Sequence, residues 1–425
     1  MTNKKQSDRL PQHIIDELLD KVSLKDVVSI LRMTSESETM KRAICPFHSS
    51  KDNNKSLSLD YDSNKFYCDV CNFKGTAIGW LMYHDGLSFK ESILNLSQIA
   101  DVDVSNWIDE QSLIDARKSQ ASILNEVTSF YQRQTSNADI MDYIRSRDIS
   151  GVTQSRFSIG YAPIDDDIFN DSFSSHARNL WNQGHLIRRS DGEFSPRFRN
   201  RLMFPIRNPA GDTVGFGARA LGNALPKYLN SPTSPVFNKS KTLYGLYEML
   251  SLGLPIDSLC LVEGYMDVIT ASQHGFTNTV ATLGTAATAH HIEMIFEHTD
   301  TLVVCFDGDQ AGQKAAMRLL EIALPHLSDE HRLSFAMLPA GDDPDTLLRR
   351  SGASAFNDEL FKAEPIEVFL HNKLCANFDT TEIGGKAALA SAAKPLINSM
   401  VSNRLKSIMI EKMEETVGIP WFYGW

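Results

Sequence analysis

Apolar and polar positions change their spacing along this chain, and each spacing predicts a different element. Within residues 11–31, Ile14, Leu18 and Val22 recur at helical spacing and would share one face of a helix. Residues 56–71 instead alternate between apolar and polar types, in SLSLDYD and KFYCDVC, which is typical of short strands. The chain therefore opens with a helix followed by a small sheet.

Helical spacing returns over residues 76–100 and dominates again over residues 113–149. The polar stretch 101–112 separates these regions and is a candidate linker, although its Trp107 could instead be packed in a core. Residues 150–245 are mixed and rich in Gly, Pro and Arg, so no single type of element is predicted there.

From residue 258 the pattern becomes an alternation of strand and helix. Four apolar runs read as strands, namely SLCLVEG, TNTVATLG, TLVVCFDG and LSFAMLP. Helical stretches follow the first three, which predicts a parallel sheet covered by helices. After Asp345 the chain reads as helical to about Glu415. The predicted fold class is a multidomain protein that combines α+β and α/β parts.

The length of 425 residues exceeds one ordinary hydrophobic core and favours two to four domains. No run of about 18 apolar residues is present, so no transmembrane helix is expected. The opening MTNKKQSDRLPQ lacks the apolar segment of a secretory signal. The sequence predicts a cytoplasmic protein that does not associate with a membrane.

The net charge of −11 is distributed unevenly. Residues 185–245 contain ten Lys/Arg and three Asp/Glu, a local balance of +7. Residues 257–346 contain three Lys/Arg and fourteen Asp/Glu, a local balance of −11. Since the distribution of charge matters more for binding than its sum, we expect one surface for a polyanion and another for cations.

Cys45, His48, Cys68 and Cys71 form two pairs, C-x2-H and C-x2-C, with 19 residues between them. Zinc prefers four such ligands in a tetrahedron, and a two-residue gap lets a tight turn present both members of a pair. Four protein ligands leave no open coordination position, so we expect one structural zinc ion. The alternative is three unrelated core cysteines and a surface histidine.

Three aromatic residues near these pairs, Phe66, Tyr67 and Phe73, have two interpretations. They could offer platforms on which bases stack, or they could pack around the metal in a domain with little other core. Cys260 and Cys305 lie in apolar runs and are expected to be buried core thiols.

Acidic residues follow three of the predicted strands. They are Glu263 in LVEGYMD, Asp307 and Asp309 in VVCFDGD, and Asp342, Asp343 and Asp345 in LPAGDDPD. Because the carboxyl ends of parallel strands meet at one edge of a sheet, these side chains should gather in a crevice. Their repulsion is tolerable if cations neutralise them or some are protonated. Hard oxygen ligands suit Mg²⁺ or Mn²⁺.

Such an acidic crevice would support phosphoryl chemistry. Two magnesium ions about 4 Å apart can activate a 3′-hydroxyl group and stabilise a leaving pyrophosphate. Gly264 and Gly308 would permit tight turns directly after two of the strands. Acidic loop residues also cap helices, and capping competes with metal binding most directly for Asp309, just before a helix expected near Ala311.

These motifs closely resemble the bacterial replicative DNA primase family of the DnaG type. CPFH and the later CDVC resemble its zinc ribbon, and EGYMDV, TLGTA, FDGDQAG and DDPDT resemble its toprim domain, a fold shared with some topoisomerases. RFRNRLMFPIRN, VGFGARALG and PKYLNSPTSPVFNKSKTLYGLYE resemble the other half of its polymerase domain. The resemblance runs from about residue 10 to about residue 418, with three motif blocks in the family's order.

The resemblance implies an RNA polymerase that makes short primers on single-stranded DNA from ribonucleoside triphosphates, with two or three divalent ions. Glu263, Asp307 and Asp309 match the catalytic acids, and Asp267, Asp343 and Asp345 join them as candidate magnesium ligands. Template and nucleotide would lie on a basic ridge made of Arg147, Arg199, Arg201, Arg219, Lys227, Tyr228, Lys239 and Lys241.

The residue types of this ridge agree with that role, because Arg and Lys contacts to phosphates give affinity without sequence preference. Arg199 and Arg201 alternate, so they would share one face of a strand. Arg188 and Arg189 are interpreted as solvated surface charges.

The resemblance divides the chain into five parts. They are a zinc-ribbon DNA-binding domain at 1–102, an N-terminal lobe of the polymerase domain at 113–250, a toprim catalytic domain at 256–346, a helical subdomain at 347–418 and an atypical tail at 419–425. A monomer is expected.

Two stretches depart from the family pattern. The family usually has a threonine-proline-serine run after CPFH, where this chain has DNNKSLS. The family also carries a C-terminal domain that binds the replicative helicase, whereas this chain reads VGIPWFYGW where that domain would begin, which argues against recruitment by the helicase.

Two other functions fit parts of the sequence. Another toprim enzyme, a topoisomerase or a nuclease, would share the acids, but a topoisomerase needs a nucleophilic tyrosine in a separate domain, and no segment resembles one. A template-binding module without activity is the second alternative. The presence of Glu263, Asp307 and Asp309 argues against it.

Overall fold

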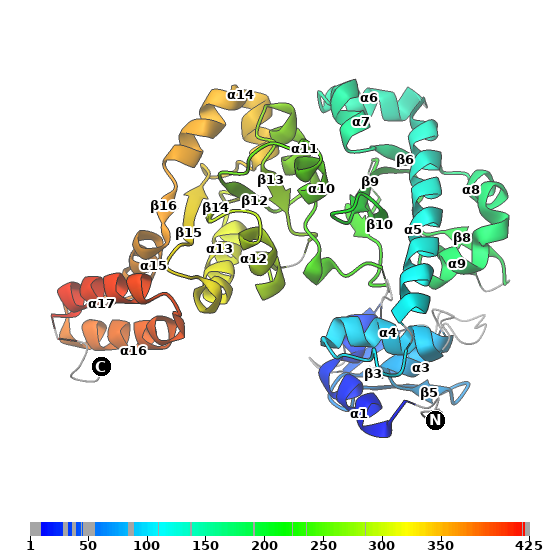
Figure 1. Ribbon diagram of the computed structural model, residues 1–425, viewed down its shortest axis with the longest axis horizontal. Coiled ribbons are helices and arrows are strands. Elements are labelled where there is room, and N and C mark those ends of the chain that lie inside the picture. The colour runs from blue at the N-terminus through cyan, green and yellow to red at the C-terminus, as the bar shows by residue number, and fades with distance from the viewer. Residues whose placement is uncertain are drawn as a thin grey trace, which may run out of the picture. The chain divides into compact units, whose positions relative to one another are not determined.

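The computed structural model describes most of the chain (Figure 1). The described residues are 10–28, 33–35, 40–43, 45, 56–83, 89–108, 110–136, 138–189, 192–222, 224–234, 236–284, 286–418 and 420. The chain forms two compact units, each built from three segments. The first unit comprises Met1–Met141, Ser158–Ile206 and Asp212–Asn238, and the second comprises Asp142–Phe157, Arg207–Gly211 and Lys239–Trp425. The domain boundaries expected above stay a prediction.

The helical region expected at 11–31 consists of α1 (Gln12–Lys21) and α2 (Leu24–Val27). Ser23 separates them, because its hydroxyl accepts a hydrogen bond from the Lys25 N–H while the Asp26 carboxylate accepts one from the Ser23 N–H. This reciprocal capping starts a new helix. Residues 29–32 lie outside the described part of the chain.

An antiparallel sheet of five strands follows in chain order, and it includes the strands expected at 56–71. The strands are β1 (Met33–Ser35), β2 (Met40–Ala43), β3 (Leu57–Asp60), β4 (Lys65–Cys68) and β5 (Lys74–Gly75). Leu57, Leu59 and Phe66 point inward and pack with Trp80. Trp80 lies in α3 (Ala77–Tyr83), which is followed by α4 (Phe89–Ala100).

Part of the candidate linker at 101–112 belongs to a core. Val104 and Ile108 are buried in the cluster formed by α1, α3 and α4, and Trp107 packs against the same cluster. The long helix α5 (Glu110–Arg133) begins directly afterwards.

A second sheet in the first unit has the order β11-β10-β9-β6 and packs against α5. Its strands are β6 (Gly160–Ala162), β9 (Arg201–Arg207), β10 (Thr213–Ala220) and β11 (Tyr228–Asn230). Gly160 allows the close approach of β6 to α5, because a Cβ atom there would lie 2.6 Å from Cβ of Tyr131.

Shorter elements complete both units. Those of the first unit are η1 (Gln134–Ser136), α8 (Asp166–Phe173), η2 (Ser174–His176), α9 (Ala177–Asn182), β7 (Leu186–Arg188) and β8 (Phe194–Pro196). The second unit contains α7 (Gly151–Arg156), η3 (Lys239–Lys241) and α10 (Leu246–Leu250), and α6 (Ala138–Ser146) begins in the first unit and ends in the second.

The four strands expected after residue 258 form a sheet in the second unit, with the order β13-β12-β14-β15-β16. They are β12 (Leu259–Val262), β13 (Thr279–Ala281), β14 (Thr301–Phe306) and β15 (Arg332–Met337), all parallel. The edge strand β16 (Glu364–Pro365) is antiparallel and was not expected, because two residues carry no periodicity.

Helices cover both faces of this parallel sheet (Figure 1). Leu259, Leu261 and Val304 face the side of α12 (Ala289–Phe296) and α13 (Gln310–Ala323). The opposite side carries α11 (Tyr265–Gln273) and α14 (Pro344–Phe361), which pack against each other. The alternation of strand and helix thus gives the predicted layered architecture.

The remainder of the second unit is helical, as expected. It contains η4 (Leu324–His326), α15 (Ile366–Cys375), α16 (Ile383–Ser399) and α17 (Asn403–Val417). Cys260 and Cys305 are buried in β12 and β14, which confirms their interpretation as core thiols. None of the helices among the described residues combines the length and the apolar character needed to cross a membrane.

Candidate functional site

Three of the four predicted zinc ligands lie together in the N-terminal sheet. Cys45 follows β2, Cys68 ends β4, and Cys71 lies in the turn between β4 and β5. Their sulfur atoms lie within 4.8 Å of one another, and the Sγ atoms of Cys45 and Cys71 are 3.9 Å apart. Four ligands at a zinc–sulfur distance of about 2.3 Å require a separation of about 3.8 Å between sulfurs. His48 lies outside the described residues.

The electrostatics around Cys68 suit a metal-bound thiolate. Burial raises the pKa of its thiol, but the backbone N–H groups of Cys71 and Val70 and the side chains of Ser56 and Cys71 act against burial and lower the pKa to about 6. The thiolate is the form that binds zinc. Among the described residues, these three cysteines are the one group of three or more candidate ligands packed this closely.

The neighbouring aromatic residues divide between the two interpretations. Phe66 is buried and packs edge-on against Trp80, with 5.3 Å between ring centroids, so it belongs to the core. Tyr67 points outward with 39% of its surface exposed, and its hydroxyl donates to Asn72. Tyr67 is therefore partly exposed beside the three cysteines, whereas Phe66 is not.

The predicted acids gather at the carboxyl ends of three adjacent strands of the parallel sheet. Glu263 follows β12, and Asp307 follows the neighbouring β14. The Asp307 N–H donates to Glu263 Oε1 at 3.4 Å, so the two strand ends are in direct contact. Asp309 caps α13, where its Oδ1 accepts a hydrogen bond from the Gly312 N–H at 2.8 Å. Asp309 thus caps α13 while its side chain stays exposed to solvent.

This crowding disfavours negative charge in the absence of a cation. Burial, followed by the charges of Glu263, Asp343 and Asp309, raises the pKa of Asp307 to about 7. Burial also raises the pKa of Glu263. Asp307 Oδ1 is buried and has no hydrogen-bond partner among the described residues. An unpaired buried carboxylate oxygen beside a second carboxyl group fits a divalent cation, which prefers hard oxygen ligands.

Asp267 occupies a different environment from these acids. It is buried in α11, where one carboxylate oxygen accepts from the Gly264 N–H and the other from the Asp345 N–H. Burial, and then the charges of Asp343 and Asp307, raise its pKa well above the ordinary value. Asp267 therefore ties β12 to the start of α14.

The carboxylates of the DDPD motif also have protein partners. Asp342 is buried and forms two hydrogen bonds of 2.7 Å with Arg350. Asp343 caps α14 through the Thr346 N–H. Asp345 is buried and accepts from Arg349, from Arg147 and from the Thr270 hydroxyl. Of these three acids, Asp343 is the one whose carboxylate is described with a backbone N–H partner and without an arginine partner.

The two strand-end glycines serve close approach rather than a left-handed turn. Gly264 has an extended backbone, with φ of −125°, and a Cβ atom there would lie 2.8 Å from the Asp267 carboxylate. A Cβ atom at Gly308 would lie 2.2 Å from the carbonyl oxygen of Pro339. These glycines are expected from the sequence to permit tight turns. Their role in the structure is instead to leave room for neighbouring atoms that a Cβ atom would displace.

Four members of the predicted basic ridge gather around residues 226–228 in the first unit. Arg219 on β10 lies opposite Tyr228 on β11 and donates to its hydroxyl at 3.1 Å. Arg201 is buried and donates to the Pro226 carbonyl. The Lys227 side chain is exposed, with its Nζ 6.0 Å from the centre of the Tyr228 ring.

The other ridge residues lie elsewhere. Arg199 precedes β9, is exposed and pairs with Asp166 at 2.7 Å. The prediction that Arg199 and Arg201 share a strand face is wrong, because Asn200 between them has a positive φ of 50° and breaks the alternation. Arg147 pairs with Asp345, and Lys239 and Lys241 form the turn η3 in the second unit.

Sequence reasoning missed the cationic partners of the acids. Arg349 and Arg350 both lie on α14 and neutralise Asp345 and Asp342. The spacing of four residues from Asp345 to Arg349 on a helix is the signal that could have identified the first pair. Thr270 on α11 carried no such signal, since only the fold brings it to Asp345.

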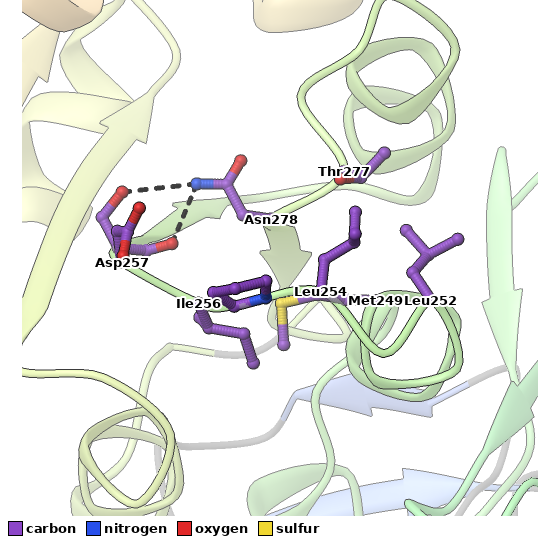
Figure 2. A pocket seen from close by; sticks show the side chains of 9 residues that line it. Met249, Leu252, Leu254, Ile256, Asp257, Thr277 and Asn278 are labelled. Atoms are coloured by element: carbon purple, nitrogen blue, oxygen red, sulfur yellow. Dashed lines mark hydrogen bonds between the residues drawn. The ribbon is translucent and has the colours of Figure 1, made fainter.

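A cavity of about 220 Å³ lies at the opposite, amino edge of the parallel sheet (Figure 2). Met249, Leu254 and Ile256 contribute to its lining, and the Asn278 side chain donates to Ser258 beside it. None of the predicted catalytic or binding residues lines this cavity. This cavity is therefore separate from the acidic carboxyl edge of the same sheet.

Three family models match successive regions of the chain. A model described as CHC2 zinc finger matches residues 10–112, and one described as DNA primase catalytic core, N-terminal domain, matches residues 129–250. A model described as Toprim-like matches residues 260–348. These matches support a structural zinc ion and the use of divalent metal by this chain.

Curated relatives match nearly the whole chain. The DNA primase of Salmonella typhimurium is 36% identical over 401 residues, which is 92% of this chain and 69% of that protein. The DNA primase of Escherichia coli K12 is 35% identical over 420 residues, which is 97% of this chain and 72% of that protein. This chain belongs to the DnaG family of bacterial DNA primases. The Pseudomonas aeruginosa primase, 36% identical, is covered to 63% of its length.

Solved primase structures share the fold. The DnaG primase catalytic domain bound to single-stranded DNA is 38% identical, with a TM-score of 0.67, covering 70% of this chain and 98% of that chain. The zinc-binding and RNA polymerase domains of the Aquifex aeolicus primase are 25% identical, with a TM-score of 0.61, covering 96% of this chain and 97% of that chain. This primase is therefore an enzyme of RNA primer synthesis in DNA replication.

Proposed function

We propose that this primase joins ribonucleoside triphosphates on a single-stranded DNA template at the edge formed by Glu263, Asp307 and Asp309. The observation that carries the proposal is the contact between the Glu263 carboxylate and the Asp307 backbone, beside the Asp307 Oδ1 atom, which has no hydrogen-bond partner in the described part of the chain. This arrangement concentrates negative charge that a bound cation would stabilise.

We assign two or three Mg²⁺ or Mn²⁺ ions to this edge, with Asp343 as a further ligand. When bound, such ions supply positive charge to the attacking 3′-hydroxyl and to the departing pyrophosphate. The protein's share is to hold Glu263 and Asp307 at fixed strand ends and Asp309 on a helix cap, so that few groups must reorganise during the reaction. Asp267 and Asp345 are also predicted from the sequence as magnesium ligands. Because their carboxylates already accept hydrogen bonds from protein groups, we propose that they stabilise this edge and bind metal less directly than Glu263 and Asp307.

Template binding is assigned to the exposed Lys227 ammonium group and the Tyr228 ring in the first unit, with Lys239 and Lys241 of the second unit as further phosphate contacts. Lys227 and Tyr228 combine a charge with an aromatic face, which suits single-stranded nucleic acid. One zinc ion held by Cys45, His48, Cys68 and Cys71 would order the N-terminal sheet. We propose that the chain acts as a monomer in the cytoplasm, within the domain boundaries expected from the sequence.

The test is primer synthesis from labelled ribonucleotides on single-stranded DNA, with magnesium, with manganese and with a chelator. We expect labelled primers with either metal and none with the chelator, and activity should return when metal is restored. Deoxyribonucleotides alone are the matched control. Template-directed products without divalent metal, or from deoxyribonucleotides only, would contradict the proposal.

A further inference from the structure

Two lysines of the basic ridge lie on one short turn of the second unit. Lys239 and Lys241 occupy η3, a single 3-10 turn of three residues. The Lys239 side chain is exposed and that of Lys241 is half-buried. A turn of three residues has little stability of its own. Its geometry therefore depends on the groups that hydrogen-bond to its backbone.

The turn is held by two side chains at the amino end of α12. The carbonyl oxygen of Lys239 lies 3.0 Å from His291 Nε2. The carbonyl oxygen of Ser240 accepts a hydrogen bond of 2.7 Å from the Thr288 hydroxyl. Two consecutive carbonyl groups of the turn are therefore fixed by residues about 50 positions further along the chain, as the separations of 52 and 48 residues show.

The hydrogen bonds at the helix cap determine the donor on each side chain. The Thr288 N–H donates to His291 Nδ1 at 3.2 Å, so the neutral ring carries its proton on Nε2, which then donates to the Lys239 carbonyl. The Thr288 oxygen accepts from the His291 N–H at 3.3 Å, which leaves its own hydrogen for Ser240. His291 is fully buried, and burial lowers the pKa of its ring, which favours this neutral form.

A second clamp lies on the other side of the turn. The backbone groups of Tyr244 and Ala281 exchange two hydrogen bonds of 2.9 Å, which tie the chain after the turn to the end of β13. The TLGTA segment at 282–286 connects Ala281 to the His291 and Thr288 cap. This segment therefore lies between the two attachments that hold the lysine turn to the parallel-sheet unit.

We propose that His291 and Thr288 are positioning residues of the primase reaction, which hold the Lys239–Lys241 turn so that its ammonium groups meet phosphates. The proposal rests on the proposed function, in which these lysines bind phosphate. The phosphate could belong to a ribonucleoside triphosphate or to the template, and separate measurements distinguish the two. A hydrogen bond that fixes a turn improves binding by removing conformational freedom before the ligand arrives.

Conservative variants separate positioning from general packing. In His291→Gln the side-chain amide can reach the place of Nε2 and donate to Lys239, whereas in His291→Asn it reaches only the place of Nδ1. We expect His291→Asn to raise the KM for ribonucleotides or the Kd for a single-stranded oligonucleotide about three- to tenfold, with kcat less affected. His291→Gln should recover most of that loss. At Thr288, the valine variant removes the hydroxyl that donates to Ser240 and should show the same loss, whereas the serine variant keeps the hydroxyl and should recover most of it.

Thr299→Val is the matched control in the same unit. The Thr299 hydroxyl also donates to a backbone carbonyl, that of Asp257, at 3.0 Å, but at the amino edge of the sheet. The Thr299→Val variant should have a lower melting temperature but an unchanged KM for ribonucleotides and an unchanged Kd for the oligonucleotide. A rise in KM alone assigns the turn to the triphosphate, and a rise in Kd with a smaller salt dependence assigns it to the template.

A double-mutant cycle tests two claims separately: that the lysine turn binds phosphate, and that His291 acts by positioning this turn. Lys239→Ala with Lys241→Ala should weaken binding, and His291→Asn should add little in that background. If the lysine variants bind and react normally, the turn binds no phosphate, and both its proposed role and this inference fall. If they weaken binding but His291→Asn still costs its full factor without the lysines, His291 is only structural. If His291→Asn does not fold, Thr288→Val takes its place in the cycle.

Discussion

Arg147 Nη1 donates to Asp345 Oδ2 at 3.2 Å, although 198 residues separate the two in the chain. Both side chains are largely buried, with 23% and 6% of their surfaces exposed. Asp345 is shared with Arg349 and Thr270, so Arg147 joins a network on the parallel-sheet unit. This placement gives a basic residue of the predicted ridge a partner within the protein.

Arg147→Ala should therefore act mainly on stability. Removing one partner of a buried pair leaves part of the Asp345 charge uncompensated, and we expect a loss of about 1 to 3 kcal/mol. Thermal unfolding would show this loss, while the affinity for single-stranded DNA should change less than in Lys227→Ala. An unchanged melting temperature with strongly weakened DNA binding would instead place Arg147 in the binding surface.

Glu263→Gln should separate chemistry from binding. The substitution keeps size and hydrogen-bonding capacity but removes a charge beside Asp307, so primer synthesis should fall by about two orders of magnitude or more. DNA affinity, measured by fluorescence anisotropy, should stay the same or rise slightly. Asp309→Asn is a matched comparison, because asparagine still caps α13 and should mainly raise the magnesium requirement. Near-normal primer yield from Glu263→Gln would show that this acid is structural.

Removal of zinc should loosen the N-terminal sheet selectively. Cys68→Ser removes the thiol that ends β4 and should lower the zinc content to well below one ion per chain. Limited proteolysis should then cut within the first hundred residues or so, while the parallel-sheet unit stays resistant because it has its own core. Elemental analysis that finds no zinc in the unaltered protein would remove the basis of this expectation.

Lys227→Ala should weaken template binding uniformly across sequences. The exposed ammonium group beside Tyr228 is suited to one phosphate, so its loss should reduce the slope of log affinity against log salt by about one contact. Arg188→Ala, at a position interpreted as a solvated charge, is the control and should leave the slope unchanged. Equal slopes for the unaltered protein and Lys227→Ala would move the binding surface elsewhere.

Glu248 should make stability depend on pH. It is buried in α10, with Oε1 3.7 Å from Arg207 Nη1, and burial raises its pKa to about 7 although Arg207 acts in the opposite direction. Because the folded state holds this proton more tightly than the unfolded state, the free energy of unfolding should fall as pH rises from about 4 to about 7, by about 2 to 3 kcal/mol. Urea unfolding at about pH 5 and pH 8 should show a smaller difference in Glu248→Gln.

The sequence predicted the elements and the gathering of acids well, because both depend on local patterns. Hydrophobic spacing placed β12, β14 and β15, and the rule for parallel strands brought Glu263 beside Asp307. The partners of individual charges were harder to predict. Arg147 reaches Asp345 through tertiary packing, which leaves no periodic trace in the chain.

Local backbone geometry explains the remaining differences. Ser23 interrupts the first predicted helix because its capping hydrogen bonds start a new helix, α2, directly after α1. At Asn200, a single positive φ precedes the start of β9, so Arg199 lies outside the strand that contains Arg201. Such single-residue effects are energetically small, so an average pattern over ten or more residues does not reveal them.

The interleaving of the two units has a consequence for how the protein is made. The chain passes between the units five times, and Asp142–Phe157 belongs to a unit whose main part begins only at Lys239. A ribosome adding about 5 to 20 residues per second needs on the order of ten seconds or more to pass from Arg147 to Asp345, which lie 198 residues apart. During that interval Arg147 has been synthesised but Asp345 has not, so the second unit can complete its fold only after Asp345 has left the ribosome.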